Sequence, residues 1–165
     1  MQSNFDNHRM DHRTPEEFMD DIKASAIIER DIVERYARYV MRVYGVQIVI
    51  TDNGCDNSGK FLTKGQVTTK ADYLINGKPC EIKHFKPKLG ELPLKVDSLK
   101  SYIKQGAPIL LVNGYCSKAA EFTLIQPEQI QMIIDTCTPV RHAPWGGKLA
   151  FMMKKSDFKW CNLDN

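Results

Sequence analysis

The sequence has 165 residues, of which 42% are hydrophobic and 26% are charged, and its formal net charge is +3. These values are ordinary for a single globular domain, and the five cysteines, an odd number without a CxxC pair, favour neither a disulfide framework nor a zinc site. No apolar run approaches the ~18 residues of a membrane-spanning helix, and the polar N-terminus lacks a signal-peptide core. We therefore expect a single cytoplasmic domain, residues 1–165, with no membrane partner.

Residues 15–44 are predicted to be helical and follow a polar tail, residues 1–13, that we expect to be flexible. The helix start carries a capping box in which Thr14 is the N-cap and Glu17 is the third helical residue. No glycine or proline interrupts the segment after its first residue. It therefore forms either one long helix or two helices with a break near Ser25.

Strands and turns are predicted for the next part of the chain. β-branched and apolar residues indicate the strands, and glycine next to asparagine or serine indicates the turns. The predicted elements are a strand at 46–51, a loop at 52–65, and a hairpin whose strands, 71–75 and 80–85, are joined around Asn76-Gly77.

Helices and strands alternate in the second half. The predicted elements are a helix at 94–105, a fully buried strand at 108–113, a strand at 121–125, a helix at 127–135, a loop at 138–147 and a final strand at 148–155. The order α-β-β-β-α-β with additions predicts an α/β protein with one mixed sheet flanked by helices.

Positive charge gathers in one segment. Residues 60–104 carry ten lysines and four acidic residues, a net charge of +6. A positive field beside acidic side chains suits a polyanionic substrate. A solvated lysine-rich face explains the charge equally well.

The predicted hairpin carries charged residues that need an explanation. A two-residue turn at residues 76 and 77 predicts that Asp72 faces Glu81, with Cβ atoms about 4.5–5.5 Å apart, and such carboxylates repel one another. A divalent cation bound between them would remove this repulsion, because hard cations take carboxylate oxygens as ligands. Alternation puts Lys83 on the face of Glu81, where it can orient a water or neutralise an oxyanion. Because Pro79 cannot donate a ladder hydrogen bond, a longer turn that shifts the strand pairing is an alternative. A salt-bridged surface hairpin is the alternative to a metal site.

The N-terminal helix offers a third carboxylate. At 100° per residue, Val33, Tyr36 and Val40 lie within about 40° of Glu29, which places Glu29 on the core-facing stripe. Glu34 points roughly opposite and is assigned to the surface. A glutamate on an apolar stripe needs a partner, so we interpret Glu29 as a metal ligand or as an orienting residue at a metal site. The alternative is a position at the edge of the core, neutralised by a lysine.

These residues resemble a known family. The sequence ADYLINGKPCEIK, with Asp72, Glu81 and Lys83, resembles the motif of the PD-(D/E)XK nuclease superfamily, with Ala71 at the position of the proline that names the motif. The segment IERDIVERY is similar to the first helix of Holliday-junction resolvases, where a glutamate begins the same kind of segment. The resemblance covers roughly residues 25–125. It implies a restriction-endonuclease-like αβββαβ core, here with a C-terminal β/α addition.

The resemblance also implies a mechanism, the Mg²⁺-dependent hydrolysis of phosphodiester bonds. Asp72 and Glu81 would hold Mg²⁺, for which Mn²⁺ could substitute, with the backbone carbonyl of Ile82 as a further ligand. Glu29 would bind or orient a second ion or a metal-bound water. Lys83 would position the nucleophile and stabilise the charged phosphate.

The implied substrate is nucleic acid, with DNA favoured over RNA and branched or junction DNA as one form. An RNA (tRNA) nuclease on the same core and a non-catalytic nucleic-acid-binding module are the alternatives. A homodimer is expected from the resemblance alone. The lysines expected to contact backbone phosphates are Lys60, Lys64, Lys70, Lys86, Lys95 and Lys100.

Overall fold

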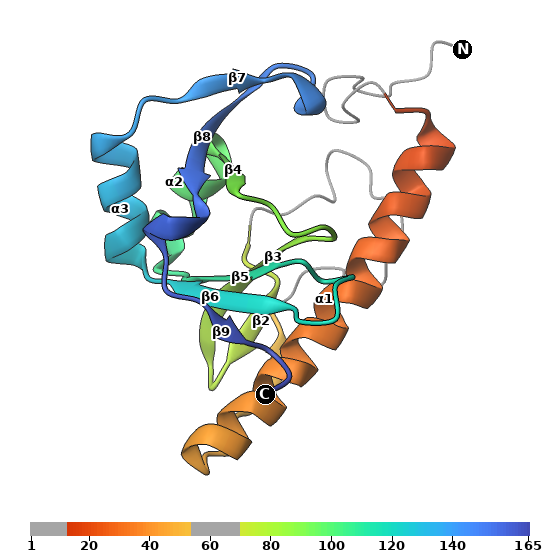
Figure 1. Ribbon diagram of the computed structural model, residues 1–165, viewed down its shortest axis with the longest axis vertical. Coiled ribbons are helices and arrows are strands. Elements are labelled where there is room, and N and C mark those ends of the chain that lie inside the picture. Colours follow the sequence, from red (N-terminus) through yellow and green to blue (C-terminus); the bar gives the residue numbers. More distant parts are fainter. Residues whose placement is uncertain (1–12, 54–69) are drawn as a thin grey trace.

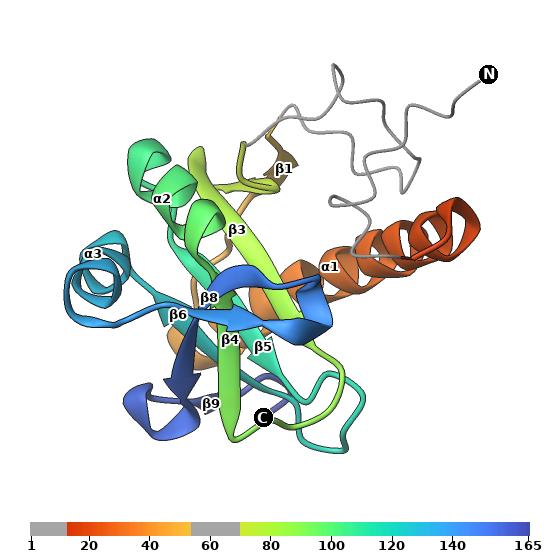
Figure 2. The ribbon, with the colours of Figure 1, turned by 90° about the horizontal axis from the view of Figure 1, so that it is seen from above.

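The computed structural model describes residues 13–53 and 70–165, so the tail expected at residues 1–13 lies outside it except for its last residue. Within these ranges the protein is a mixed α/β fold in three layers, seen from two directions in Figures 1 and 2. A long helix covers one face of a six-stranded main sheet, and two shorter helices with a three-stranded small sheet cover the other. The prediction of an α/β protein with a mixed sheet flanked by helices is confirmed.

The long helix α1 (Pro15–Tyr44) is continuous and does not break near Ser25. Its start has the predicted capping box, in which the Thr14 side chain accepts from the Glu17 amide at 3.2 Å and the Glu17 carboxylate accepts from the Thr14 amide at 2.9 Å. The helix ends where Gly45 takes a left-handed conformation with φ of 65°. Its apolar stripe, which includes Ile28, Ile32 and Tyr39, packs in one core with residues of β2, β3, β5 and β6.

The main sheet has the strand order β1-β2-β3-β5-β6-β9. Only β3 and β5 are parallel, and every other neighbouring pair is antiparallel. Its strands are β1 (Ile50–Asp52), β2 (Tyr73–Ile75), β3 (Lys78–Phe85), β5 (Ile109–Asn113), β6 (Glu121–Ile125) and β9 (Cys161–Asn162).

Strand β5 explains why both faces of the main sheet are covered. It was predicted to be a buried strand, and all five of its residues are buried. Leu110 and Val112 pack with α1 residues such as Ile32, whereas Ile109 and Leu111 pack in the core on the opposite face. Alternation along one apolar strand therefore contributes to two separate cores.

The hairpin of β2 and β3 has the predicted register around the turn. Ile75 pairs with Lys78, and Tyr73 pairs with Cys80. The turn residue Asn76 has φ of 50°, and the glycine that follows is also left-handed, as a two-residue hairpin turn requires. The strand predicted at 46–51 is shorter than expected, because only its end belongs to β1 (Ile50–Asp52).

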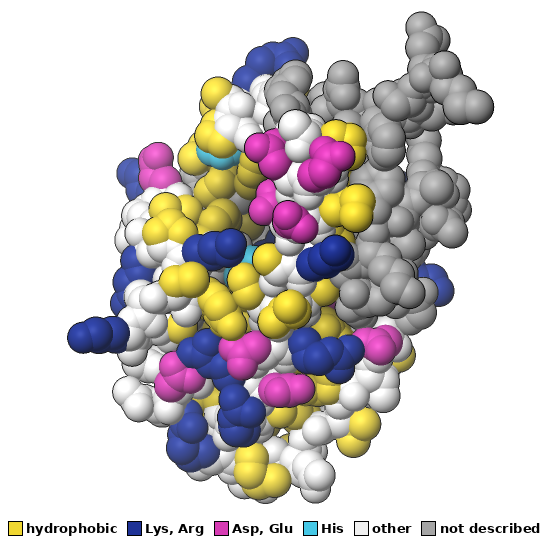
Figure 3. Space-filling view, turned by 90° about the vertical axis from the view of Figure 1, so that its right-hand side faces the viewer, with side chains coloured by type: hydrophobic (Ala, Val, Ile, Leu, Met, Phe, Trp, Pro, Cys, Tyr) yellow, Lys and Arg dark blue, Asp and Glu magenta, His cyan; other side chains and the backbone are white. Residues whose placement is uncertain are grey.

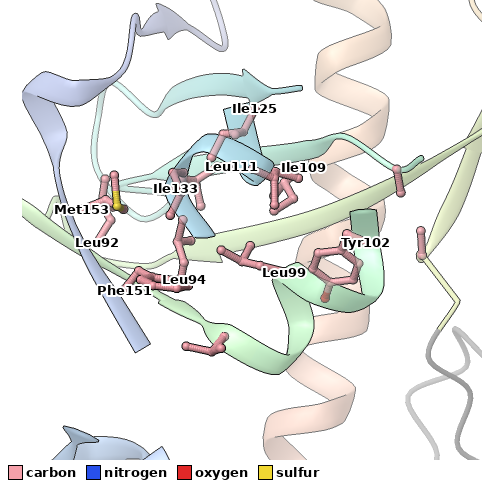
Figure 4. Close-up of a cluster of buried hydrophobic side chains, with 14 residues drawn as sticks. Leu92, Leu94, Leu99, Tyr102, Ile109, Leu111, Ile125, Ile133, Phe151 and Met153 are labelled. Atoms are coloured by element: carbon pink, nitrogen blue, oxygen red, sulfur yellow. The ribbon is translucent and has the colours of Figure 1, made fainter. Parts of the chain in front are cut away.

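The far layer contains elements that the sequence only partly indicated. Figure 4 shows the apolar cluster that joins this layer to the main sheet. The elements are β4 (Glu91–Lys95), α2 (Val96–Gln105), α3 (Pro127–Thr136), β7 (Val140–His142), a 3₁₀ turn η1 (Ala143–Trp145) and β8 (Lys148–Lys154). The small sheet has the order β4-β8-β7.

Three expectations for this layer were wrong. The helix predicted at 94–105 begins at Val96, because Leu94 belongs to β4 and pairs with Phe151 of β8. The segment 138–147, predicted to be loop, contains β7 and η1, and β8 is not the last strand, because β9 follows it. The first and third errors come from pairings between segments that are distant in sequence, β4 with β8 and β6 with β9, whereas β7 pairs with the adjacent strand β8. None of the helices in the described part of the chain is long and apolar enough to cross a membrane.

Candidate active site

The candidate site begins where the two strands of the hairpin separate. The β2–β3 ladder ends at the Tyr73–Cys80 pair, so it does not extend to the predicted pair of Asp72 and Glu81. Instead, Asp72 Oδ2 accepts a hydrogen bond from the backbone amide of Ile82 at 3.1 Å. The side chain of Asp72 thereby turns toward β3 beyond the ladder and into the neighbourhood of Glu81.

Glu81 is the buried centre of the site and is only 4% exposed. Its Oε1 accepts a hydrogen bond from the Tyr102 hydroxyl of α2 at 2.5 Å, and the same oxygen contacts Lys83 Nζ. Lys83 lies on the face of Glu81, as alternation predicted, and its side chain is 41% exposed. A buried carboxylate is thus held between a buried phenol and an ammonium group that reaches the surface.

Glu29 approaches from α1 and is held by a short chain of polar contacts. Its Oε1 accepts from Ser25 Oγ at 2.9 Å, and Ser25 Oγ lies 3.1 Å from His84 Nε2. Because a serine hydroxyl has one hydrogen, which Ser25 gives to Glu29, the His84 contact requires a protonated Nε2. His84 Nδ1 is then an acceptor, and it is buried without a hydrogen-bond partner among the described residues.

The charges of these side chains act on one another. Burial raises the pKa of Asp72 to about 8, with repulsion from Glu81 and Glu29 adding to the rise and the ammonium of Lys83 opposing it. Burial also raises the pKa of Glu29, against the opposing effects of Lys83 and of the Ser25 hydrogen bond. Glu29, predicted on the core-facing stripe, therefore shares one electrostatic environment with the hairpin carboxylates, whereas Glu34 is exposed as predicted.

The cationic and aromatic neighbours have shifted pKa values as well. Burial disfavours the charged form of Lys83, but Glu81, Tyr102 and Asp72 outweigh it and raise the pKa of Lys83 well above its usual value. Lys83 is therefore a fixed positive charge near neutral pH and is poorly suited to act as a general base. Burial, with the positive charges of Lys83 and Lys86, lowers the pKa of His84 to about 4, so its ring is neutral.

The site opens into a cavity of about 430 Å³. Glu29, Lys83 and Tyr102 line it, and so does Trp145 of η1, which belongs to the far layer. The cavity therefore lies between the candidate site and the small sheet.

The predicted phosphate-contacting lysines are dispersed. Lys70, Lys86 and Lys100 are exposed, and Lys95 lines the cavity with its Nζ 4.8 Å from the centre of the Trp145 ring. Lys60 and Lys64 lie outside the described residues.

The donor chemistry of the site fits a hard cation, but the side chains do not form a complete cage. Across residues 13–53 and 70–165, no group of three or more His, Cys, Asp or Glu side chains is placed to hold a metal ion. Magnesium is commonly held by only one or two carboxylates, with waters and substrate phosphates completing its shell. Asp72 and Glu81, two largely buried carboxylates beside the Ile82 backbone, are compatible with that mode of binding.

Sequence reasoning missed three members of this site, namely Tyr102, Ser25 and His84. Ser25 lies one helical turn before Glu29, a spacing that could have indicated contact. Alternation turned His84 away from Lys83, which is compatible with its contact to α1, but the sequence did not indicate the link to Glu29. Tyr102 carried no local signal, because its approach to Glu81 depends on how α2 packs.

No family model matches the sequence, and neither a curated protein nor a solved structure is significantly similar to it.

Proposed function

We propose that this protein is a metal-dependent nuclease of the PD-(D/E)XK superfamily that hydrolyses phosphodiester bonds in DNA. One observation carries the proposal. The motif residues Asp72, Glu81 and Lys83, together with Glu29 of α1, share one electrostatic environment at the open end of a hairpin. Carboxylates such as Asp72 and Glu29, whose pKa values are raised chiefly by burial beside a fixed ammonium, are typical of functional sites.

The strand order also supports the proposal. The elements α1, β1, β2, β3, α2, β5 and β6 follow one another in the order αβββαβ, extended by one strand and with β4 inserted before α2. The β1-β2-β3 meander is antiparallel, and the α2 crossover makes β5 parallel to β3. This element order supports the αβββαβ core that the resemblance implies. The elements α3, β7, β8 and β9 then form the C-terminal β/α addition.

The residues that would hold Mg²⁺ are Asp72, Glu81 and the backbone carbonyl of Ile82, and Mn²⁺ would substitute. Glu29 would hold or orient a second ion or a water. When bound, the ion supplies an activated water and neutralises charge on the phosphate. The proposal accounts for the raised pKa of Asp72, because a cation offsets both the burial and the repulsion that cause it.

Each protein side chain then has a role that follows from its contacts. Lys83 remains charged, contacts Glu81 and reaches the surface, so it can orient the attacking water and stabilise negative charge on the phosphate. Tyr102 donates to Glu81 and holds that carboxylate in place. Ser25 does the same for Glu29. The exposed lysines, Lys70, Lys86 and Lys100, would contact backbone phosphates without reading sequence.

The test is a panel of duplex, branched and single-stranded DNA with tRNA, incubated with and without Mg²⁺. We expect metal-dependent cleavage of DNA that is lost in Asp72→Asn and Glu81→Gln. The matched control is Glu91→Gln, which changes an exposed glutamate at the start of β4 and should retain full activity.

Two results would contradict the proposal. Cleavage that persists unchanged in both carboxylate variants would show that the site is elsewhere. Calorimetry that detects no Mn²⁺ binding dependent on Asp72 and Glu81, together with nucleic-acid binding but no cleavage, would favour a non-catalytic module. Cleavage of tRNA but not DNA would retain the mechanism and change the substrate.

A further inference from the structure

The cavity beside the candidate site has a second wall that takes no part in the proposed chemistry. This wall is built by β4, α2 and η1, and its apolar surface comes from Pro93, Leu94 and Leu99. Figure 3 shows hydrophobic side chains lining a hollow beside a group of acidic side chains. The cavity thus joins an apolar wall to a charged and polar one, and its volume of about 430 Å³ lies within the common range for ligand pockets.

Trp145 is the aromatic group of this wall. It ends the short turn η1, where Gly146 has φ of 64° and turns the chain back toward β8. Its ring lies 4.6 Å from the His142 ring in an edge-to-face contact, and Lys95 Nζ lies over it at 4.8 Å. An indole ring, a lysine ammonium and an apolar surface are therefore gathered in one cavity.

We infer that this cavity binds one unpaired nucleotide of a nucleic-acid strand, next to the phosphate that is cleaved. The inference rests on the proposed function, whose substrate class it narrows. The base would lie against Trp145 and the apolar wall, and its phosphate would lie toward Lys83 and the carboxylates. A base is apolar on its faces and polar at its edges, which matches a wall of this composition.

The lysine above the Trp145 ring does not prevent stacking. A cation–π contact at a partly exposed site is weaker than the stacking of a base on an aromatic side chain. A base can therefore take the place of the Lys95 ammonium on the ring. The lysine remains close enough to contact a phosphate of the same strand, so both groups contribute to binding the nucleotide.

The size of the cavity selects the form of the substrate. It has room for one nucleotide, whereas a base inside a duplex is paired and stacked and cannot enter it. A strand must therefore present an unstacked nucleotide, and single strands, flaps and branch points do so at the lowest energetic cost. Uninterrupted duplex must first be unpaired and should bind less well.

The test uses the two tryptophans of the chain as reporters. In Trp160→Phe the remaining tryptophan is Trp145, and its fluorescence is followed while single-stranded DNA, single-stranded RNA or blunt duplex DNA is added with Ca²⁺ in place of Mg²⁺. We expect single strands to quench the fluorescence at concentrations well below those required for duplex. In the matched control, Trp145→Phe, the remaining Trp160 lines a different surface pocket and should not respond.

Affinity provides a second measurement. Replacing Trp145 by alanine should weaken single-strand binding about 5- to 150-fold, the range for removal of one stacked base, while Trp145→Phe should retain most of the affinity. Circular dichroism of both variants checks that they fold.

The outcomes separate this inference from the proposed function. Quenching by blunt duplex as strong as by single strands, or no quenching by any strand, would overturn the nucleotide pocket even if Mg²⁺-dependent cleavage depends on Asp72. Quenching by single strands without cleavage of any substrate would support the pocket and contradict the nuclease. Quenching by RNA alone would support the pocket with RNA as its ligand.

Discussion

The main sheet and the small sheet contribute to the candidate site in different ways. The main sheet brings together charged residues of α1 and of one hairpin, where Asp72 and Ile82 are ten positions apart. The small sheet pairs β4 with β8, two segments separated by more than fifty residues, and it contributes an aromatic and apolar wall. The hairpin part of the site is thus encoded locally, whereas the shape of the adjoining cavity depends on distant pairing.

The small sheet is nevertheless part of the main core. Leu92 and Leu94 of β4 and Phe151 and Met153 of β8 belong to the same apolar cluster as Leu111 of the main sheet. Figure 4 shows these side chains pointing toward one another from separate elements. The small sheet should therefore unfold together with the main sheet.

The largest expected effect tests this coupling. Phe151→Ala removes a side chain that is only 2% exposed and should lower the free energy of unfolding by about 3–5 kcal/mol. Leu149→Ala, on the same strand but 46% exposed, should change it by less than about 0.5 kcal/mol. Denaturant unfolding measured by circular dichroism compares the two. Two separate transitions in the wild type would show that the sheets are independent.

The next largest effect compares a lysine of the site with another lysine of the same strand β3. Lys83→Met removes the ammonium group that contacts Glu81 and should lower kcat about 10²- to 10³-fold, the typical cost of losing one electrostatic stabiliser. Lys78→Met removes an exposed lysine from the start of the same strand and should leave kcat unchanged. Steady-state cleavage assays measure both. Equal losses in the two variants would mean that the lysines act only through general attraction of the substrate.

Much of the main sheet and its site could be predicted because the signals are local. The capping box at Thr14, the turn at Asn76 and the apolar run of β5 each depend on a few neighbouring residues, and all three were predicted correctly. The position of Glu29 followed from helical periodicity alone. Motif spacing then selected the carboxylates and the lysine that the structure brings together.

The small sheet could not be predicted in the same way. Its short strands have no strong pattern of their own, and the end of β4 was predicted as the start of a helix rather than as part of a strand, because Leu94 also fits a helical spacing. Only the pairing of Leu94 with Phe151 decides between the two. Tyr102 was missed for a related reason, because its contact with Glu81 depends on α2 packing against β3 rather than on any sequence spacing.

The raised pKa of Asp72 predicts a dependence of stability on pH. Since the native state retains a proton that the unfolded state releases, the free energy of unfolding should fall with rising pH by about 1.5 kcal/mol between pH 6.5 and 8. His84 has the opposite effect below this window, because its lowered pKa makes the unfolded state bind the additional proton. Urea unfolding at several pH values, in the absence of divalent cations, measures the slope.

Two variants show which titrating group causes this dependence of stability on pH. In Asp72→Asn it should largely disappear, because the carboxyl that titrates in this window is replaced. In Glu91→Gln it should match the wild type. Saturating Mg²⁺ should flatten the wild-type slope if the cation binds the ionised carboxylates. An unchanged slope in Asp72→Asn would place the titrating group elsewhere.

The smallest expected effect concerns Tyr102, through which the far layer contacts the site directly. Tyr102→Phe removes one hydrogen bond to Glu81 and leaves the Lys83 contact on the same oxygen, so the loss should be about 1 kcal/mol, or about fivefold in kcat. If Tyr102 positions Glu81, Mn²⁺ affinity measured by calorimetry should fall while KM for the substrate stays constant. A loss of stability with unchanged kcat and Mn²⁺ affinity would mean that the Tyr102 hydroxyl only stabilises the fold. In that case the far layer would influence the site only through the shape of the cavity.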